Sequence, residues 1–509
     1  MQSSNTMGEA ASPAAGTATE LRNLVGGSWS AGRGQAVTLY NPADAKAEVA
    51  RFTYSTQDDV RDAVTAAERA FVEWRSTPIV KRCRILAHCK ELLEQHRMEI
   101  ARLIVIENGK TLGEAEAEVR RGLEVVEFAA GMPSLSKGDY IPDISGRIDG
   151  YMLREPLGVV VGACPFNFPA MIPMWMFPVA IACGNTFVLK PSEKCPMTAT
   201  RLVELFQEGG LPAGVLNVLQ GDRETFAAMI AAEPVRAVSF VGSTPAAEAV
   251  WKLAGSHHKR VQALGGAKNH NIVMPDADPQ GAVNAVVGAA YGCAGERCMA
   301  TSTVVLVGEA GKLLPGLIDA ARSLRMGDGL ETETTLGPLI SAAHRDRVLE
   351  YLELGQREGA KLVLDGREAS TDGLPDGHFL GASIFDQVTP EMRIAREEIF
   401  GPVLCVMRAA DLDEAIALAN QSEFGNGASI FTNSGGAAQH FRTNIEVGMI
   451  GINAGVPAPM AMFSFGGHKN SIYGDLRAQG PDAIEFYTQK KTVIERWFGT
   501  GPTGSIWSK

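Results

Sequence analysis

The chain has 509 residues, enough for about three domains of ordinary size. Hydrophobic residues make up 45% and charged residues 21% of the sequence, which is typical of a globular protein and excludes a disordered or fibrous chain. Acidic residues outnumber basic ones by 58 to 47, and the formal charge of −11 argues against nucleic acid or an anionic membrane as a partner.

The N-terminus and the cysteines indicate where the protein works. Residues 1–20 lack the pattern of a secretory signal or of a mitochondrial presequence, so we expect a flexible tail there. The eight cysteines are scattered and none forms a CxxC pair, which predicts neither a disulfide framework nor a metal site. A reducing, cytoplasmic location fits these features best.

A helix is predicted to begin after Thr56, with Asp59 placed to cap it and with apolar residues along one side. From Gly158 onward, short β-branched runs alternate with helical segments; the runs are 159–161, 187–189, 215–219, 237–241, 272–274 and 303–307. Strands separated by helices predict doubly wound α/β sheets, whose ligands bind at the carboxyl ends of the strands. The alternating run 483–497 predicts an edge strand at an oligomer interface.

Residues 157–189 contain no Asp, Glu, Lys or Arg and are long enough to span a bilayer. Four prolines would break a continuous helix there: Pro165, Pro169, Pro173 and Pro178. We therefore expect buried strands joined by a buried loop, and no membrane span.

Two segments contain candidates for catalysis. Cys298 follows Arg297 in a run of small residues, a setting that can expose the sulfur and favour its thiolate; a buried, inert cysteine is the alternative, and Cys293 is a second candidate. Asn167 follows the strand at 159–161 and could donate to a developing oxyanion, although asparagines in turns usually bond only to the backbone.

Two other segments could bind a nucleotide. Lys190 and Glu193 follow the strand at 187–189 and could hold ribose hydroxyls, or lie in a solvated loop. The strand at 237–241 is followed by Gly242, Ser243 and Thr244, where the N-terminus of the next helix could bind a pyrophosphate.

In combination, the segments PFNFP (165–169), KPSE (190–193), FVGST (240–244), GERC (295–298) and EEIFGP (397–402) resemble the NAD(P)-dependent aldehyde dehydrogenase superfamily. The resemblance implies that Cys298 attacks the aldehyde and that Asn167, with the backbone N–H of Cys298, binds the oxyanion. It also implies NAD contacts from Phe166, Lys190, Glu193, Gly242, Ser243, Thr244, Glu398 and Phe400. The charge of Glu193 favours NAD over NADP.

One motif departs from that superfamily. Its hydrolytic members have Glu-Leu-Gly-Gly-Lys, where the Glu activates water, but residues 262–270 here read QALGGAKNH and place Ala263 or Leu264 at the Glu position. No Asp or Glu occurs between Glu248 and Asp276. General-base help is worth about 10² to 10⁴-fold, so hydrolysis should be slow and a thiol such as coenzyme A should accept the acyl group.

A closer resemblance is to the CoA-acylating methylmalonate-semialdehyde dehydrogenases, through GAKNH (266–270), GERCMA (295–300), PMAMFSF (459–465) and FYTQ (486–489). It implies NAD-dependent oxidation of malonate or methylmalonate semialdehyde, loss of the carboxyl group, and release of acetyl-CoA or propionyl-CoA. A substrate carboxylate calls for arginine; Arg121 and Arg297 match the family positions, and Arg120 competes with Arg121.

Some positions near the expected aldehyde pocket depart from the subfamily, among them Gly455 and residues 464–472. Alternatives are therefore a dehydrogenase of another short aldehyde, hydrolytic or CoA-dependent, and a non-catalytic NAD-binding protein. We expect an NAD-binding domain (21–135 and 151–263), a catalytic domain (264–469) and an oligomerisation element (136–150 and 470–509) of a homodimer or homotetramer.

Overall fold

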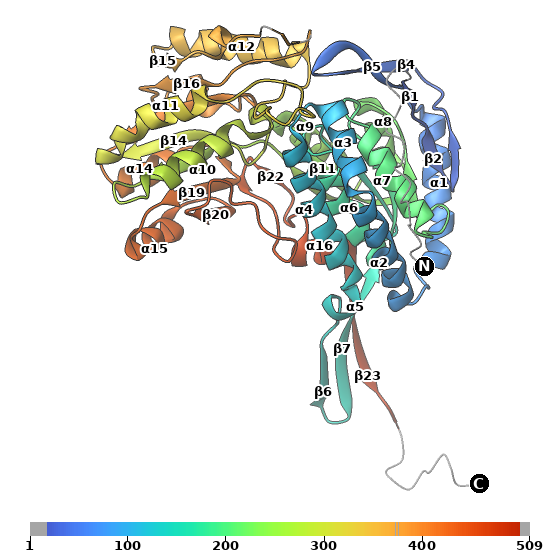
Figure 1. The fold of residues 1–509 in the computed structure, drawn as a ribbon. Helices are drawn as coiled ribbons and strands as arrows, with labels where there is room; N and C mark the ends of the chain where they lie inside the picture. Colours follow the sequence, from blue (N-terminus) through green and yellow to red (C-terminus); the bar gives the residue numbers. More distant parts are fainter. Residues whose placement is uncertain (1–17, 372, 375, 499–509) are drawn as a thin grey trace, which may run out of the picture.

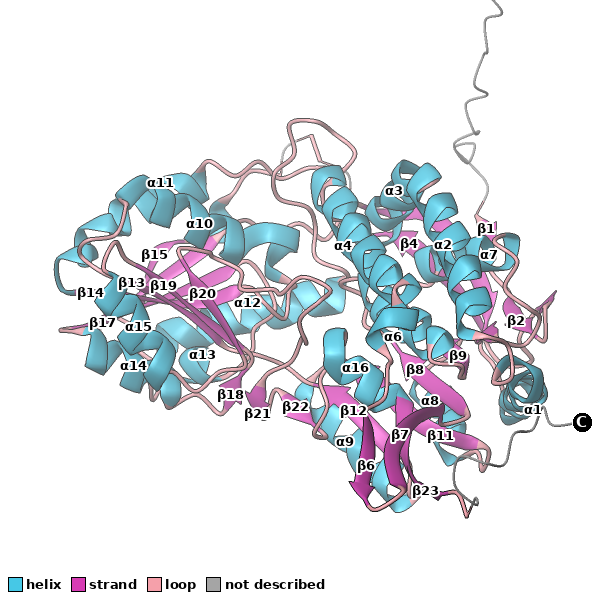
Figure 2. Ribbon diagram, turned by 90° about the horizontal axis from the view of Figure 1, so that it is seen from below, coloured by secondary structure: helices cyan, strands magenta, loops and turns pink. Residues whose placement is uncertain are grey.

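Two α/β sheets lie side by side in the computed structural model, which describes residues 18–371, 373–374 and 376–498, and a small three-stranded sheet projects below them (Figure 1). Helices pack on both faces of the larger sheets (Figure 2). Most of the predicted tail lies outside the described residues. Two of its residues, Thr19 and Glu20, form strand β1 beside β5.

The first large sheet has eight strands in the order β22-β12-β11-β8-β9-β10-β2-β3. Its five central strands, β12 to β10 in that order, are parallel, as the alternation of strands and helices predicts. The bounds are β22 Ile472–Tyr473, β12 Arg260–Leu264, β11 Val235–Val241, β8 Val159–Ala163, β9 Thr186–Lys190, β10 Leu216–Val218, β2 Asn23–Val25 and β3 Ser28–Ser30.

Alternate side chains of β8 enter two different hydrophobic clusters. Val159 and Val161 pack with α1 Gln57–Trp74, α8 Arg223–Ala231 and α9 Thr244–Ser256 on one face. Val160 faces the opposite cluster, which includes α2 Ile79–Gln95, α3 Arg97–Asn108, α4 Leu112–Ala130, α6 Met171–Ala182 and α7 Met197–Glu208. A strand buried on both faces needs apolar residues at every position, which explains its unbroken β-branched run.

The second large sheet has seven strands in the order β15-β16-β17-β14-β13-β19-β20, all parallel except β15. Their bounds are β15 Lys361–Leu364, β16 Ser383–Asp386, β17 Val403–Ala409, β14 Thr301–Val307, β13 Asn269–Val273, β19 Gly427–Phe431 and β20 Met449–Ile452. The helices of this region are α10 Pro279–Tyr291, α11 Leu314–Arg322, α12 Ala342–Arg357, α13 Arg393–Arg396, α14 Leu412–Asn420 and α15 Gly435–Asn444.

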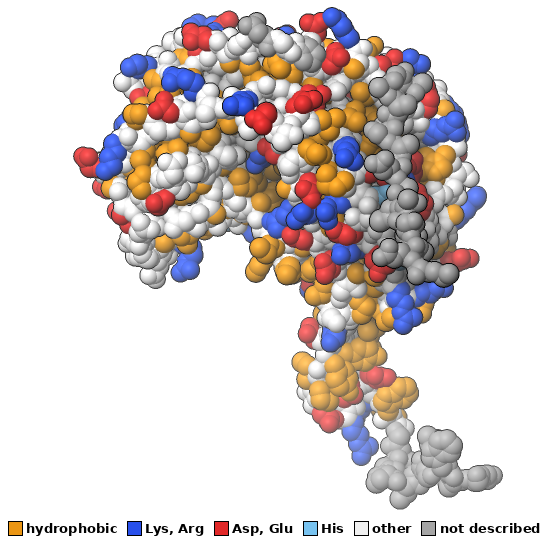
Figure 3. Space-filling model, viewed as in Figure 1, with side chains coloured by type: hydrophobic (Ala, Val, Ile, Leu, Met, Phe, Trp, Pro, Cys, Tyr) orange, Lys and Arg blue, Asp and Glu red, His pale blue; other side chains and the backbone are white. Residues whose placement is uncertain are grey.

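The projecting sheet consists of β6 Tyr140–Ser145, β7 Ile148–Pro156 and β23 Thr488–Arg496, in the order β23-β7-β6. Hydrophobic side chains lie on its surface (Figure 3), including Ile141 and Ile494, which are 59% and 62% exposed. The remaining elements are β1 Thr19–Glu20, β4 Ala36–Asn41, β5 Asp44–Thr53, α5 Met132–Leu135, β18 Phe424–Gly425, β21 His468–Lys469, α16 Gly480–Tyr487 and the short 3₁₀ turns η1 Gly292–Gly295, η2 Gly308–Leu313 and η3 Gly366–Glu368.

All six predicted strands are present, and Thr56 and Asp59 form the predicted capping box of α1. Two predictions were wrong. Residues 157–189 contain the buried helix α6 between β8 and β9, because Pro173 lies in its first turn and the surrounding core stabilises the helix around Pro178. The first part of 483–497 is α16, which packs on α6; only 488–496 is a strand.

None of the helices within the described ranges is both long enough and apolar enough to cross a lipid bilayer.

Candidate active site

A tight turn places Cys298 between the two large sheets. Cys293 and Ala294 have φ values of 51° and 52°, in the left-handed region that non-glycine residues rarely adopt. Gly295 continues the turn at φ 75°, and a Cβ at this position would lie 2.1 Å from the carbonyl oxygen of Gly401. Such local strain persists only where the surrounding structure imposes it, and it is common at functional sites.

Two buried amides fix the main chain of Cys298. The carbonyl oxygen of Cys298 accepts hydrogen bonds from Asn269 Nδ2 at 2.9 Å and from Asn426 Nδ2 at 3.0 Å. Asn269 also donates to the carbonyl of Ala300 and accepts from the N–H of Gly427. The peptide of the candidate nucleophile is therefore held by a side chain of β13 and by one of the turn before β19.

The Cys298 thiol is protonated at neutral pH in this structure. Burial is the main cause that raises its pKa to about 12, and the negative charge of Glu398 is the second. The charge of Arg297 lowers the pKa. A nucleophilic thiolate at this position therefore requires a change of surroundings when ligands bind. Cys293, the other candidate, also lines the cavity, and burial raises the pKa of its thiol as well; it is buried, whereas Cys298 is partly exposed.

Asn167 lies beside the chain that leads to Cys298. Its side-chain Nδ2 donates to the carbonyl oxygen of Glu296 at 2.9 Å, and its backbone carbonyl oxygen accepts from Lys110 Nζ at 2.6 Å. An amide nitrogen carries two hydrogens, so one N–H remains for a ligand.

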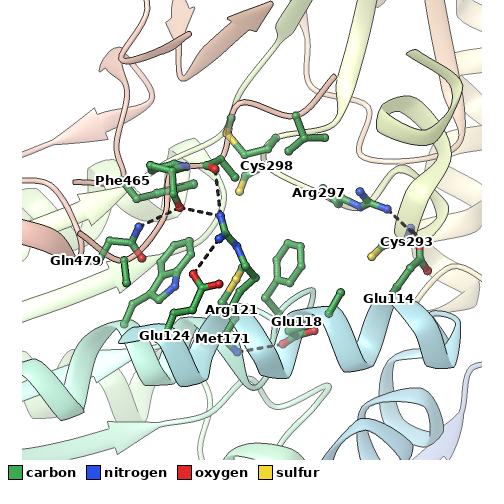
Figure 4. Close-up of a pocket in the computed structure, with 18 residues that line it drawn as sticks. Glu114, Glu118, Arg121, Glu124, Met171, Cys293, Arg297, Cys298, Phe465 and Gln479 are labelled. Atoms are coloured by element: carbon green, nitrogen blue, oxygen red, sulfur yellow. Dashed lines mark hydrogen bonds and ion pairs between the residues drawn. The ribbon is translucent and has the colours of Figure 1, made fainter. Parts of the chain in front are cut away.

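A mostly apolar cavity of about 210 Å³ opens next to Cys298 (Figure 4). Its wall includes Phe168, Met171, Trp175 and Phe465, and its charged lining residues are Glu114, Arg121, Glu124 and Arg297, together with Glu118, whose charged side chain has no exposed surface. A short aldehyde in this cavity would meet the sulfur of Cys298 and two guanidinium groups. The cavity is therefore a candidate pocket for a small substrate with an anionic end.

Arg121 extends from α4 toward the cavity (Figure 4), and its contact with a substrate stays a prediction. Its Nη1 pairs with Glu124 at 2.8 Å, and its Nη2 donates to the carbonyls of Ala458 and Pro459 at 3.1 and 3.0 Å. A substrate carboxylate would have to replace one of these partners. Its sequence neighbour Arg120 does not line the cavity; it is exposed and pairs with Glu116.

Arg297 pairs with Glu114 at 2.9 Å, and Glu114 also accepts the backbone N–H of Cys293 at 2.7 Å. The guanidinium lies against Gly292, where a Cβ would be 1.3 Å from Nη2, so a side chain at this position would displace Arg297. The buried Nε of Arg297 has no hydrogen-bond partner among the described residues. The ion pair with Glu114 therefore sets how this guanidinium is presented at the cavity.

The predicted nucleotide contacts lie in two groups. At the end of β9, Lys190 Nζ and Glu193 Oε2 are 3.0 Å apart. Burial alone would raise the pKa of Glu193, but the charge of Lys190, hydrogen bonds and the charge of Lys194 together lower that pKa, so the carboxylate is ionised at neutral pH. A lysine and a carboxylate at a strand end are suited to hold ribose hydroxyls, and that role stays a prediction.

The second group begins at α9. Ser243 caps this helix with its backbone and Thr244 is its first residue, so the free N–H groups of its first turn point away from the helix body. Thr244 Oγ1 accepts from the N–H of Gly266 at 2.8 Å, and the next residue, Ala267, donates to Glu398 Oε1 at 2.9 Å. Burial raises the pKa of Glu398 to about 7. These contacts connect the candidate pyrophosphate site to Glu398.

The loop around Phe400 links this group to the segment that contains Asn167. The rings of Phe166 and Phe400 pack edge to face, with centroids 6.0 Å apart. Phe400 has φ 61°, and its carbonyl oxygen lies 2.6 Å from His344 Nε2. Lys194 lies above the Phe166 ring at 5.1 Å. The predicted nucleotide residues therefore lie at the ends of β8, β9 and β11 and in the loop 397–402, and their donors and carboxylates fit an NAD molecule.

The position of the missing base is apolar in the structure as well. Ala263 and Leu264 are the last residues of β12, and both are buried. The negative charge of Glu398 raises the pKa of the Cys298 thiol, and its carboxylate accepts the N–H of Ala267.

Several residues that position the site were not recognised from the sequence. Asn269 and Asn426 hold Cys298, and Lys268 Nζ donates to the carbonyls of Ile394 and Glu397, just before Glu398. Asn269 and Lys268 belong to the GAKNH motif, so the motif indicated their importance but not their contacts. Glu114 could have been recognised as the end of a Thr-x-x-Glu capping box, but its bond to Arg297 depends on tertiary structure.

The profile of the Aldehyde dehydrogenase family matches residues 29–493. A malonate-semialdehyde dehydrogenase from Halalkalibacterium halodurans is 52% identical over 483 residues, covering 94% of this chain and 99% of that protein. The crystal structure of methylmalonate-semialdehyde dehydrogenase from Oceanimonas doudoroffii is 46% identical with a TM-score of 0.93, covering 95% of this chain and 99% of that one.

A protein assigned as methylmalonate-semialdehyde dehydrogenase from Sinorhizobium meliloti 1021, crystallised with NAD, is 43% identical, also with a TM-score of 0.93; the match covers 95% of this chain and 99% of that one. The fold, the order of the motifs and these similarities agree, and the chain belongs to the aldehyde dehydrogenase family.

Proposed function

We propose that this protein is an NAD-dependent, CoA-acylating dehydrogenase of malonate or methylmalonate semialdehyde. The thiol of Cys298 loses its proton to solvent and its sulfur attacks the aldehyde carbon, and the oxyanion accepts hydrogen bonds from Asn167 Nδ2 and from the N–H of Cys298. Lys190, Glu193, Ser243 and Glu398 would hold NAD, which would supply the acceptor for the hydride that leaves this adduct. The product on the enzyme is a thioester between the acyl group and Cys298.

The observation that supports CoA as the acceptor is the apolar pair at the end of β12. Ala263 and Leu264 occupy the position from which hydrolytic relatives activate water, and neither can take a proton. The thiol of CoA can attack the thioester as a thiolate without help from that position. Release as acyl-CoA therefore needs no base at this point of the site.

The two arginines support a substrate with a carboxylate. Arg121 and Arg297 line one cavity with Cys298. Oxidation of malonate semialdehyde places a thioester carbonyl β to the carboxylate. When the carboxyl group leaves, the electrons of its C–C bond pass into the thioester as an enolate, which then takes a proton. The CoA thiolate then attacks the thioester and displaces Cys298. The product is acetyl-CoA, or propionyl-CoA when the substrate is methylmalonate semialdehyde.

We also propose that the protein is a homodimer or homotetramer. The three-stranded sheet carries exposed isoleucines, and among the described residues its outer strands β6 and β23 pair only with β7. Edges and apolar faces of this kind are normally covered by a partner.

A burst experiment tests the acceptor. Enzyme mixed with malonate semialdehyde and saturating NAD, without CoA, should form NADH rapidly in an amount equal to Cys298 and then slow sharply. Addition of CoA should restore rapid turnover, because the thioester is then released. Linear NADH formation at the full rate without CoA would show that water is activated by another group and would refute the proposal.

A further inference from the structure

A buried ion pair supports the segment that contains Asn167. Lys110 follows the end of α3 and Glu118 lies in α4, and their charged atoms are 2.7 Å apart. Both side chains have 0% exposed surface. Within the described residues, no other ion pair is as fully enclosed.

The pair forms hydrogen bonds at both ends of residues 167–171, which lead from the loop after β8 into α6. Lys110 Nζ donates to the carbonyl oxygen of Asn167 at 2.6 Å and lies 4.3 Å from the centre of the Phe168 ring. Glu118 Oε1 accepts the backbone N–H groups of Ala170 at 2.8 Å and Met171 at 3.1 Å. The position of the Asn167 peptide is therefore coupled to one pair of charges.

Fold stability alone does not account for this arrangement. Transfer of two charges out of water is costly, and buried ion pairs can often be replaced by uncharged groups without loss of stability. The contacts with 167–171 supply a different reason. The side-chain amide of Asn167 bonds to the carbonyl of Glu296, two residues before Cys298, so a shift of the Asn167 peptide would move that amide relative to the nucleophile.

We infer that Lys110 and Glu118 are positioning residues, which hold the Asn167 amide where it stabilises the oxyanion formed at Cys298. The inference rests on the proposed function of Asn167. A misplacement of about 1 Å in a catalytic group can cost about 100-fold in rate, so loss of the Lys110 bond should slow hydride transfer even though Lys110 does not touch the substrate.

The test is a double-mutant cycle. In K110M/E118Q, the glutamine can still accept from Ala170 and Met171, and methionine fills the space of the lysine, so the main loss is the bond to Asn167. Single-turnover NADH formation should fall by about 30 to 100-fold. In the Asn167→Ala background, the same two changes should cost no more than about threefold, because the amide that they position is absent.

Three measurements separate positioning from general damage. The melting temperature and the Kd of NAD should match the wild type, and the control K252M/E248Q, which neutralises an exposed pair on α9, should keep its rate within about twofold. Should K110M/E118Q fail to fold, Lys110→Met alone takes its place in the cycle.

Equal losses in the two backgrounds, or no loss in either, would overturn the inference. If Asn167→Ala itself left hydride transfer unchanged, the proposed role of Asn167 would fail, and the positioning role with it. If Asn167→Ala is slow but shows no coupling to the pair, only the positioning role fails.

Discussion

Glu193 should determine the choice between NAD and NADP. Its carboxylate is ionised and lies beside Lys190, where it can accept ribose hydroxyls but would repel a 2′-phosphate. Glu193→Gln should raise kcat/KM for NADP relative to NAD by about tenfold, or about 1.4 kcal/mol. Steady-state kinetics with both cofactors measures this ratio. The exposed Glu91→Gln is a control of equal charge change, and an unchanged ratio in Glu193→Gln would remove Glu193 from the ribose site.

Arg121 should act on the substrate carboxylate and not on the aldehyde group. Arg121→Leu should raise KM for malonate semialdehyde by at least about tenfold, because it removes a charge-assisted hydrogen bond, and should change KM for propionaldehyde much less. Arg120→Leu, which alters the neighbouring exposed arginine, should leave both values near the wild type. Equal effects of Arg121→Leu on the two substrates would contradict this assignment.

The ionisation of Glu398 should make cofactor binding depend on pH. Burial raises its pKa to about 7, so the carboxyl is mostly protonated at about pH 6 and mostly ionised at about pH 8. The ionised form accepts ribose hydroxyls more strongly, so NAD affinity should increase by up to about tenfold over this range. Calorimetric titration at several pH values measures it. Glu398→Gln should bind more weakly with little pH dependence; an equally steep increase in that variant would assign the titration to another group.

Burial also fixes the sign of the effect of Glu398 on stability. Its folded-state pKa lies above the ordinary value of 4.5, so the unfolded chain loses this proton first as pH rises. The contribution of this group to stability therefore declines from about pH 4.5 upward and levels off above about pH 7, where the folded form is also ionised.

For individual residues, the sequence indicated candidates for the site but not which side chains form pairs there. Lys190 and Glu193 are three residues apart, and their contact follows from local geometry. The partner of Arg297 is Glu114, 183 residues away, and that of Asn167 is Lys110, 57 residues away. Such contacts depend on how α3 and α4 pack against the loops of both sheets, which local sequence patterns do not specify.

Among the elements, the projecting sheet should hold the oligomer together. Ile141, Gly150 and Ile494 lie opposite one another on adjacent strands, so the two isoleucines share one face over a glycine. Ile494→Glu places a charge on that face and should weaken self-association by about 100-fold, since the burial of one isoleucine contributes about 2 to 3 kcal/mol. Sedimentation velocity over a range of concentrations measures this. Gln489→Glu adds the same charge on the opposite face of β23 as a control; an unchanged oligomer in Ile494→Glu would place the interface elsewhere.

The strands were easier to predict than the helices around them. The runs that became β8, β9 and β11 are β-branched and bounded by turns, and buried parallel strands require that composition. Helix α6 is apolar on all sides because the core surrounds it, so no helical period marks it. Helix α16 is short and is followed directly by β23, so in the sequence the apolar residues of the two elements form one alternating run.

For the whole molecule, the order of the motifs along the chain predicted the α/β fold and the family, because three of the five motifs come at the ends of β8, β9 and β11, where ligands of parallel sheets bind. The absent carboxylate at 263–264 was visible in the sequence, and the structure shows that both residues are buried at a strand end. The Lys110–Glu118 pair could not be predicted, because its role depends on a segment more than 45 residues further along the chain.

Transfer of the acyl group from Cys298 to CoA can be measured directly. The experiment follows NADH from malonate semialdehyde and from methylmalonate semialdehyde, with and without CoA, and identifies the products by mass spectrometry. Turnover should occur only with CoA, with acetyl-CoA from the first substrate and propionyl-CoA from the second. Free acids formed at the full rate without CoA would show that water, and not CoA, takes the acyl group.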